Sequence, residues 1–401
     1  MLPAEWRLRR RILDVAQEAF EAYAYAPITT PTFEDTEVFV RGVGTSTDIV
    51  RKEMYTFADG ERSITLRPEG TAPVARAFVQ HGMHKLPLPV KLWYLAPMFR
   101  HEAPQAGRYR EHYQLGAEAI GSHDPLLDAE VIALLADLYR RLEVPGVRLR
   151  VGSMGDAESR EPYRVRLLEY LEPRAQDLGP DAGARMAENP MRLFDSKEPR
   201  VAEIMRGAPK LLDALSPDAE AHYRRALAGL DALGVAYEED PLLVRGLDYY
   251  THTVFEFTCD RLGAQSGIGG GGRYDGLVEA LGGPPTPGVG FGTGVERITL
   301  ALGEESESAP ALDCYLAVLD EALRVELLPL LARLRAVGLR CESDLRGRSL
   351  KAMMRHAAAL GARRVVIVGP RDHAAGAATV RDMASGDERT VPLDRLEDEL
   401  T

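Results

Sequence analysis

Charged side chains gather around one short loop of the sequence. Arg100 and Glu102 close an alternating apolar segment, Arg108 and Arg110 lie in the loop, and a second alternating segment begins at Gln114. A planar guanidinium on a rigid strand binds a carboxylate or phosphate through two parallel hydrogen bonds. The pattern therefore indicates an anion-binding hairpin, with a solvated hairpin that carries surface ion pairs as the alternative.

The same two segments place side chains on common faces, because side chains alternate along a strand. Arg100 and Glu102 share one face by this rule. The face of the second strand carries Gln114, Gly116 and Glu118. A glycine in a strand leaves room for a ligand against the sheet, so we expect Gly116 to be open to a ligand.

A helix start follows residue 70. Thr71 is placed as its N-cap and Pro73 lies in the first turn. Glu69 immediately precedes it, where a carboxylate could accept a cationic amino group. The helix dipole alone would also favour a carboxylate there, and the two interpretations remain open.

Two glycine-rich segments could lie against a flat ligand. The first contains G-x-G-x-x-G at Gly267, Gly269 and Gly272. A dinucleotide site needs this motif between a parallel strand and its helix, but a polar, hairpin-like segment precedes it and no acid follows about 20 residues on. We therefore reject a nucleotide-dependent oxidoreductase.

The second glycine-rich segment, 288–297, has alternate glycines that strip one face of a strand. Arg297 follows at a helix start, where an arginine can stack on a base and reach phosphate; close helix–strand packing is the alternative. Residues 243–250 combine an arginine, a glycine, an acid and two aromatics. Core strands rarely hold that mixture, although a β-bulge remains possible.

The elements that must position these residues fall into two domains. Strand-like runs with short connections favour antiparallel pairing, and a helix-rich, proline-punctuated stretch interrupts them as an insertion. A polar linker, 303–310, precedes an alternation of strands and helices that predicts a small α/β sheet. The expected fold is an α+β domain with a central antiparallel sheet flanked by helices over 1–305, with its insertion at about 155–240, and a C-terminal α/β domain with a mixed sheet over 311–401.

Composition limits the class of protein. The net charge of −12 disfavours a nucleic-acid binder without closing the question. No apolar run is long enough for a membrane helix, and no secretory signal begins the chain. Three distant cysteines exclude a disulfide framework and a cysteine-rich zinc site. A cytoplasmic location is expected.

These segments, in this order, resemble a class II aminoacyl-tRNA synthetase, and specifically the histidyl-tRNA synthetase family, over nearly the whole chain. Residues 30–39 resemble motif 1, the dimer-interface element, 99–114 motif 2, and 288–297 motif 3. Arg245-Gly-Leu-Asp-Tyr-Tyr250 and 271–275 resemble two histidine-specific signatures.

The resemblance implies a role for each matching residue. Histidine binding is implied for Glu69, Gly70, Thr71, Arg100, Gln114, Glu118, Arg245, Tyr249 and Tyr250, and ATP binding for Arg100, Glu102, Arg108, His112 and Arg297. Glu118 and Tyr250 would contact the two imidazole nitrogens. Arg100 and Arg245 would be catalytic, with Arg245 where other class II enzymes place a metal. Gln105 would contact the tRNA acceptor end.

The implied activity is that of a histidine–tRNA ligase. It would form histidyl-adenylate from L-histidine and ATP, with Mg²⁺ on the nucleotide and no dedicated metal site, and then charge tRNA-His. A homodimer that does not bind membranes is expected. The family pattern has Phe where His112 stands and Arg at position 103, now Ala103. The rival is an inactive paralogue such as the regulatory subunit of ATP phosphoribosyltransferase, which lacks the C-terminal domain and the Arg245–Tyr250 signature.

Overall fold

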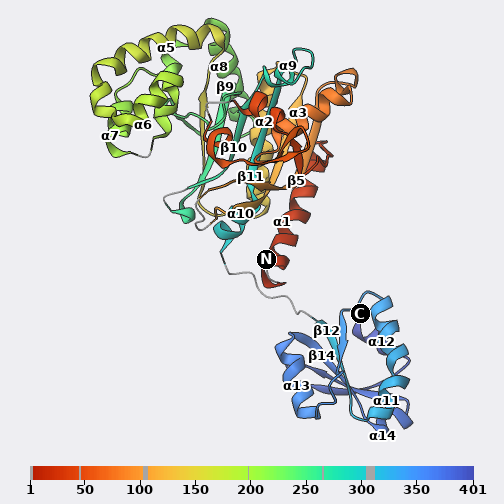
Figure 1. Ribbon diagram of the computed structural model, residues 1–401. Helices are drawn as coiled ribbons and strands as arrows, with labels where there is room; N and C mark the ends of the chain where they lie inside the picture. Colours follow the sequence, from red (N-terminus) through yellow and green to blue (C-terminus); the bar gives the residue numbers. More distant parts are fainter. Residues whose placement is uncertain (1–2, 45–46, 103–106, 197, 264–265, 304–311) are drawn as a thin grey trace. The chain divides into compact units, whose positions relative to one another are not determined.

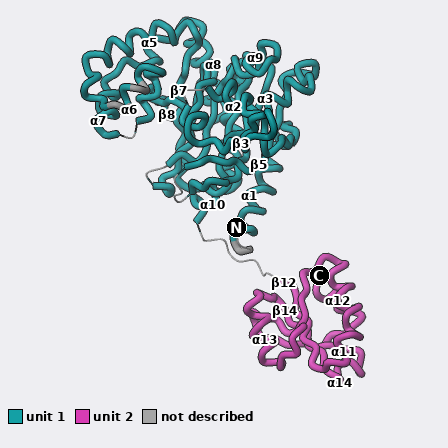
Figure 2. The backbone as a smooth tube through the Cα atoms, viewed as in Figure 1, with its two compact units in different colours: residues 1–305 teal, residues 306–401 magenta. Residues whose placement is uncertain are grey.

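The chain folds into two compact units, residues 1–305 and 306–401 (Figure 2). The computed structural model describes residues 3–44, 47–102, 107–196, 198–263, 266–303 and 312–401. Among the described helices, none combines the length and apolar character needed to cross a membrane.

An eight-stranded sheet forms the centre of the larger unit (Figure 1). Its strands, in spatial order, are β1 (Ala26–Pro27), β5 (Val90–Phe99), β6 (Glu111–Ile120), β11 (Gly288–Gly294), β10 (Gly267–Arg273), β9 (Thr251–Cys259), β7 (Val147–Ser153) and β8 (Glu238–Glu239). The six inner strands pair antiparallel, and only the two-residue edge strands pair parallel. The predicted central antiparallel sheet is therefore confirmed.

Helices bury one face of this sheet. They are α1 (Pro3–Ala22), α4 (Pro125–Arg141), α8 (Pro217–Ala232) and α10 (Val295–Leu302). The core-facing stripe of α1 includes Ile12, Ala16 and Phe20, which recur at helical spacing and are fully buried. Leu115 and Ala117 of β6 enter the same core. Because strand side chains alternate, His112, Gln114 and Glu118 of β6 must point to the opposite face.

The opposite face is only partly covered. Helices α2 (Thr36–Val43), α3 (Thr71–Gln80) and α9 (Leu277–Ala280) lie there, and Phe78 of α3 packs in one core with Tyr94 and Tyr274. A small sheet stands beside them, formed by β2 (Phe33–Asp35), β4 (Arg62–Leu66) and β3 (Tyr55–Asp59). Its Phe33 and Phe57 are about half exposed.

A helical unit of residues 157–214, here called the inserted unit, interrupts the sheet between β7 and β9. It contains α5 (Ala157–Leu171), α6 (Ala175–Glu188), α7 (Pro199–Arg206) and three 3₁₀ segments, η3 (Glu172–Arg174), η4 (Pro190–Asp195) and η5 (Leu211–Ala214). It has its own apolar core around Tyr163, Leu167 and Val201. This core continues to Leu243, Tyr250 and Val254 beside the large sheet, whereas helix α8 packs in the main core.

The smaller unit is a five-stranded mixed sheet, as predicted. Its order is β13 (Cys341–Ser343), β12 (Leu312–Val318), β14 (Ala362–Val368), β15 (Ala377–Asp382) and β16 (Glu388–Pro392). Strand β12 pairs parallel with β13 and β14, whereas β15 pairs antiparallel with β14 and β16. Helices are α11 (Glu321–Glu326), α12 (Leu328–Ala336), α13 (Leu350–Ala359), α14 (Pro370–Ala374) and α15 (Leu396–Leu400). Helices α11 and α12 are divided at Leu327, because Pro329 lies in the first turn of α12 and cannot donate to the preceding turn.

Candidate active site

A cavity of about 500 Å³ lies on the partly covered face of the large sheet. Its floor is formed by main chain of β10 and β11, with glycines at positions such as Gly270 and Gly292, which are cross-strand partners. A Cβ on Gly292 would stand 2.2 Å from the side-chain nitrogen of Gln114. Only glycine therefore leaves the floor flat, and we call this space the glycine-floored cavity.

The segment with G-x-G-x-x-G is thus an antiparallel strand, β10, between β9 and β11. It does not join a parallel strand to a helix, which is the geometry that a dinucleotide fingerprint needs. The rejection of that site is confirmed. Strand β11 runs directly into α10, so Arg297 stands at a helix start, as expected.

Four guanidinium groups line the glycine-floored cavity, those of Arg100, Arg108, Arg245 and Arg297. Each is tethered by the protein. The Nε of Arg100 donates to the carbonyl of Pro68 at 2.7 Å, and the Nε of Arg297 donates to that of Gly267 at 2.5 Å. Arg108 pairs with Glu102 at 3.1 Å, and Arg245 with Glu256 at 3.2 Å. Fixed positive charge of this kind can bind phosphate and stabilise charge that develops on it.

The expectation that Arg100 and Glu102 share a strand face was wrong, because β5 ends at Phe99. Both residues nevertheless line the cavity from the segment beyond the strand, together with His112 and Gln114. Burial, followed by the charges of Arg100 and Arg108, lowers the pKa of His112 to about 4. His112 therefore offers a neutral ring near pH 7. Ala103 and Gln105 lie outside the described residues.

A buried polar cluster lies behind Gln114 and contains Glu69, Thr71, Tyr94, Glu118 and Tyr274. Glu118 is fully buried. One of its oxygens accepts from the Thr71 hydroxyl at 2.7 Å, and the other accepts from the Tyr274 hydroxyl at 2.6 Å. Burial raises the pKa of Glu118 to about 8, against the lowering effect of these two hydrogen bonds.

Glycine on the neighbouring strand makes room for this carboxylate. Gly290 is the cross-strand partner of Glu118, and a Cβ added to it would stand 1.9 Å from Oε2 of Glu118. The carboxylate therefore occupies the space that any side chain at position 290 would need.

Thr71 was wrongly placed as the N-cap of α3. The helix begins at Thr71 and its N-cap is Gly70, which has no side chain. The carboxylate of Glu69 takes the capping role and accepts from the main-chain N–H groups of Thr71 and Ala72, both at 2.8 Å. The helix-start interpretation of Glu69 is confirmed by this geometry, and an amino-group contact stays a prediction.

Gly116 is not open to a ligand, contrary to expectation. The ring of Tyr94, its cross-strand partner on β5, fills the space, and a Cβ on Gly116 would stand 2.2 Å from that ring. The hydroxyl of Tyr94 accepts from the side chain of Gln114 at 2.9 Å. Sequence reasoning missed Tyr94, although an aromatic residue on an adjacent alternating strand was a usable signal.

Residues 243–250, here called the signature loop, contain no regular strand, so the β-bulge alternative is not found. Arg245 reaches the glycine-floored cavity. Tyr249 turns the other way, with its hydroxyl 3.4 Å from Glu69 and its ring 4.7 Å from that of Tyr250. The loop thus links the cavity to the buried polar cluster.

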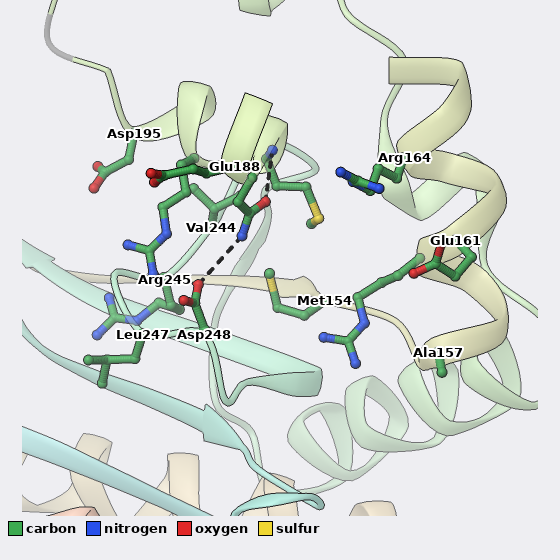
Figure 3. A pocket seen from close by; sticks show the side chains of 14 residues that line it. Met154, Ala157, Glu161, Arg164, Glu188, Asp195, Val244, Arg245, Leu247 and Asp248 are labelled. Atoms are coloured by element: carbon green, nitrogen blue, oxygen red, sulfur yellow. Dashed lines mark hydrogen bonds and ion pairs between the residues drawn. The ribbon is translucent and has the colours of Figure 1, made fainter. Parts of the chain in front are cut away.

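A second cavity, of about 340 Å³, adjoins the first (Figure 3). Arg164 and Glu161 of α5 lie on one side of it, and Arg245, Leu247 and Asp248 of the signature loop lie on the other. Arg245 and Leu247 border both cavities.

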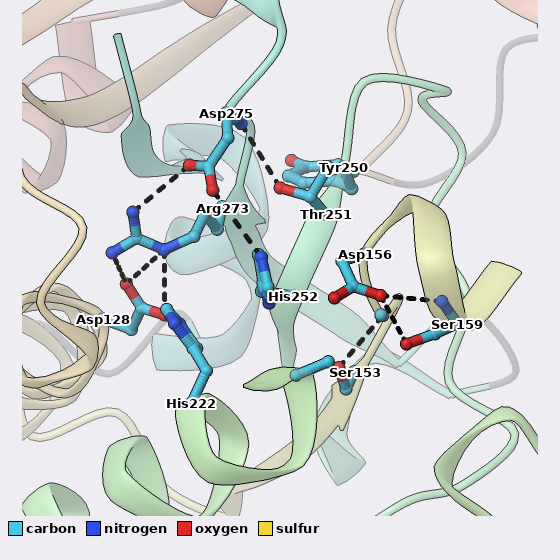
Figure 4. Close-up of polar contacts among 12 residues, drawn as sticks. Asp128, Ser153, Asp156, Ser159, His222, Tyr250, Thr251, His252, Arg273 and Asp275 are labelled. Carbon is cyan, nitrogen blue, oxygen red and sulfur yellow. Dashed lines mark hydrogen bonds and ion pairs between the residues drawn. The ribbon is translucent and has the colours of Figure 1, made fainter. Parts of the chain in front are cut away.

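A buried ionic network supports the site from behind (Figure 4). Arg273 and Asp128 are both fully buried, and the Nε of Arg273 donates to Asp128 at 3.0 Å. Asp128 also contacts His222 at 2.8 Å, and Asp275 lies 3.2 Å from the Arg273 guanidinium. The ring of His222 stacks on His252 at 4.5 Å. Because Tyr274 follows Arg273 directly, this network fixes the backbone that presents its hydroxyl to Glu118.

A family model described as histidyl-tRNA synthetase matches residues 1–298. The chain belongs to the histidyl-tRNA synthetase family. A model of the anticodon-binding domain matches residues 313–401, so the family's two-domain organisation covers nearly all of the chain.

Individual relatives agree with this assignment. The histidine–tRNA ligase of Rubrobacter xylanophilus is 50% identical over 95% of this chain and 90% of its own length. The solved apo histidyl-tRNA synthetase of S. aureus is 36% identical, with a TM-score of 0.83 over 100% of this chain and 97% of that chain. A Bacillus halodurans chain described as ATP phosphoribosyltransferase regulatory subunit/histidyl-tRNA synthetase is 24% identical, with a TM-score of 0.65 over 92% and 96% of the two chains. That last likeness shows the fold alone.

Loss of the buried carboxylate of Asp128 should destabilise the larger unit. We expect Asp128→Ala to lower its free energy of unfolding by about 3–5 kcal/mol, because the variant leaves Arg273 buried without its main counter-charge. Urea denaturation followed by tryptophan fluorescence measures this, since Trp6 and Trp93 both lie in this unit. Asp14→Ala, which breaks the exposed pair with Arg10, is the control and should cost about 0–1 kcal/mol. Equal costs for the two variants would contradict the assigned role.

The raised pKa of Glu118 predicts a pH-dependent stability. The unfolded chain releases this proton near the ordinary glutamate pKa of about 4.3, whereas the folded protein retains it until about pH 8. Between these values the unfolded state binds fewer protons, so the contribution of Glu118 to the free energy of unfolding falls as pH rises. Glu118→Gln removes this decline. The free energy of unfolding of the variant minus that of the wild type should therefore increase from pH 5 to pH 8 in urea denaturation, and a constant difference would refute the shift.

Proposed function

We propose that this chain activates L-histidine with ATP, which gives histidyl-adenylate and pyrophosphate, and then transfers histidine to the 3′ end of tRNA-His. The observation that carries the proposal is that a cavity lined by arginines adjoins a buried cluster of polar side chains. Tethered guanidinium groups surround the glycine-floored cavity, and a buried polar cluster suited to a small polar side chain lies directly behind it.

Activation requires the histidine carboxylate to attack the α-phosphorus of ATP. Negative charge then spreads over the phosphate oxygens, and fixed positive charge stabilises it without reorganisation. In the proposal Arg100 bridges the carboxylate and the α-phosphate, and Arg245 supplies charge from the opposite wall. Glu102, Arg108 and Arg297 position the nucleotide.

The base of the nucleotide needs a flat partner. We assign this role to His112, whose ring is neutral near pH 7 because its pKa is lowered. The peptide floor at Gly270 and Gly292 lets a ring approach without a side-chain clash.

The nucleotide carries the metal in this scheme. Mg²⁺ on the β- and γ-phosphates would neutralise the leaving pyrophosphate, and it needs no protein cage of its own. Within the described part of the chain, no group of three or more His, Cys, Asp or Glu side chains could hold a metal ion. In the proposal, Arg245 takes the role next to the α-phosphate.

Recognition of histidine falls to the buried polar cluster and the signature loop. Imidazole has two distinct nitrogens that need partners, and we assign them to Glu118 and Tyr250. When Glu118 is ionised, each of its oxygens has two lone pairs, so it can accept an imidazole N–H while it keeps the Thr71 and Tyr274 hydroxyls.

The α-amino group takes the remaining acceptors of the same region. Glu69, Gly70, Thr71 and Gln114 surround it in the proposal, and Tyr249 closes the pocket. Glu69 is buried beside Arg100 and Tyr249. Its carboxylate therefore lies near the residue proposed to bind the histidine carboxylate and near the residue proposed to line the pocket.

Partners follow from the rest of the chain. We propose that residues 313–401 bind the anticodon of tRNA-His in the cytoplasm, and that Gln105 contacts its acceptor end. A homodimer is proposed through the small sheet. Phe33 pairs with Leu66 and Phe57 with Ile64 across this sheet, so both exposed rings stand on one face, where a second copy would cover them.

The decisive test is amino-acid-dependent ATP–pyrophosphate exchange, run with each standard amino acid separately. Exchange with histidine alone is expected, because an imidazole offers a donor to Glu118 and an acceptor for Tyr250 from one rigid ring. A folded protein that exchanges with no amino acid would refute the proposal and favour an inactive relative of the regulatory-subunit type.

Arg245→Ala should leave the fold intact and slow histidine-dependent exchange by about 10²–10³-fold, because one preorganised charge-stabilising group is typically worth about 2.7–4 kcal/mol of barrier. Arg148→Ala is the matched control, since Arg148 makes an exposed ion pair with Asp260 away from the cavity. Wild-type turnover in Arg245→Ala would exclude the catalytic role.

A further inference from the structure

The inserted unit contacts the signature loop through one arginine. Arg192 lies in η4, and its Nη2 donates to the carboxylate of Asp248 at 2.6 Å. Its Nη1 donates to the carbonyl of Gly246 at 3.0 Å. The side chain of Arg192 is only 15% exposed, so this pair is shielded from solvent far better than a surface ion pair. One guanidinium therefore binds the loop at two points.

A second side chain of the same segment supports the contact. The amide nitrogen of Asn189 lies 3.4 Å from the Asp248 oxygen that Arg192 binds, and its amide oxygen accepts from the main-chain N–H of Met191. Asn189 thereby begins η4 and faces the loop together with Arg192. The short 3₁₀ segment is thus oriented toward Asp248 by its own cap.

The loop is held from its other side by helix α2. The main-chain N–H of Asp248 donates to the carbonyl of Val43 at 3.1 Å. Gly44 follows, with a φ of +97°, and a Cβ there would stand 2.5 Å from Oδ2 of Asp248. Asp248 is therefore enclosed between the end of α2 and the inserted unit.

The part of the loop next to Arg245 has little packing of its own. Gly246 is exposed, and nothing lies within 4 Å of the position that its Cβ would take. A glycine in open space has wide conformational freedom. Glu256 holds the Arg245 guanidinium directly, and the Arg192 contact to the Gly246 carbonyl holds the main chain next to Arg245.

We propose that Arg192 is a positioning residue for histidine activation, through which the inserted unit holds the signature loop and hence the Arg245 guanidinium in the glycine-floored cavity. This rests on the proposed function. Movement of η4 would shift Asp248 and Gly246 together. The inserted unit would then influence the rate of the activation step.

The test compares Arg192→Ala and Arg192→Lys with the wild-type full-length chain. Histidine-dependent ATP–pyrophosphate exchange is measured per active site, with sites counted by the burst of ATP consumption. We expect Arg192→Ala to lower kcat by about 10- to 100-fold, the size of effect that misplacement by about 1 Å can produce, with a smaller rise in KM for histidine. Arg192→Lys should recover part of kcat, since it keeps the charge opposite Asp248 but cannot bond two acceptors in fixed geometry.

The control is Arg200→Ala in the same unit. Arg200 pairs with Asp177 at an exposed position, so its loss should leave kcat and KM unchanged. A purely structural role for Arg192 would reduce the number of active sites without changing kcat per site, and that result would overturn the proposal.

A double-mutant cycle with Asp248→Ala separates positioning from other roles. If Arg192 acts through Asp248, the double variant should lose little more activity than the worse single variant. Losses that multiply would overturn the proposal, as would an Arg192→Ala enzyme that is defective only in transfer to tRNA. The failure of the proposed function is distinguishable, because the wild type itself would then show no histidine-dependent exchange.

Discussion

Alternation along β6 decides where the buried polar cluster lies. Leu115, Ala117 and Ala119 enter the apolar core beneath α1 and α4, so the residues between them must face the other way. That face carries Glu118, a carboxylate removed from water, which is costly unless its oxygens are hydrogen-bonded. Thr71 and Tyr274 meet this requirement from α3 and from the end of β10. Burial of Glu118 therefore requires that α3 and the segment after β10 lie close enough to donate these two hydrogen bonds.

Charge in the glycine-floored cavity is organised by the same logic. Four arginines in one space repel one another, and the protein counters this with Glu102, Glu256 and main-chain carbonyls. These anchors hold the guanidinium groups apart and in place before a ligand arrives. The acidic net charge of −12 therefore coexists with a cavity that concentrates four arginines, and total charge is a poor guide to what an enzyme binds.

Local patterns predicted the antiparallel sheet, the strand-to-helix junction before Arg297, and the mixed sheet of the smaller unit. They failed where the outcome depends on strand register or on contacts distant in sequence. Alternation identified Gly116 as a gap, but only the pairing of β5 with β6 reveals that Tyr94 fills it. Helix-start rules chose Thr71, and they could not anticipate that its hydroxyl would be drawn to Glu118, 47 residues away. The pair between Arg273 and Asp128 spans 145 residues, beyond the reach of any local signal.

The close approach of Glu118 to Gly290 limits how this site can change over time. A side chain at position 290 would need the volume that the carboxylate now fills, and a smaller residue at position 118 would leave two buried hydroxyls without their acceptor. Positions 118 and 290, on adjacent strands, therefore constrain each other. A side chain at position 290 can appear only together with a change at position 118, and a designer who reshapes this cluster begins with that pair.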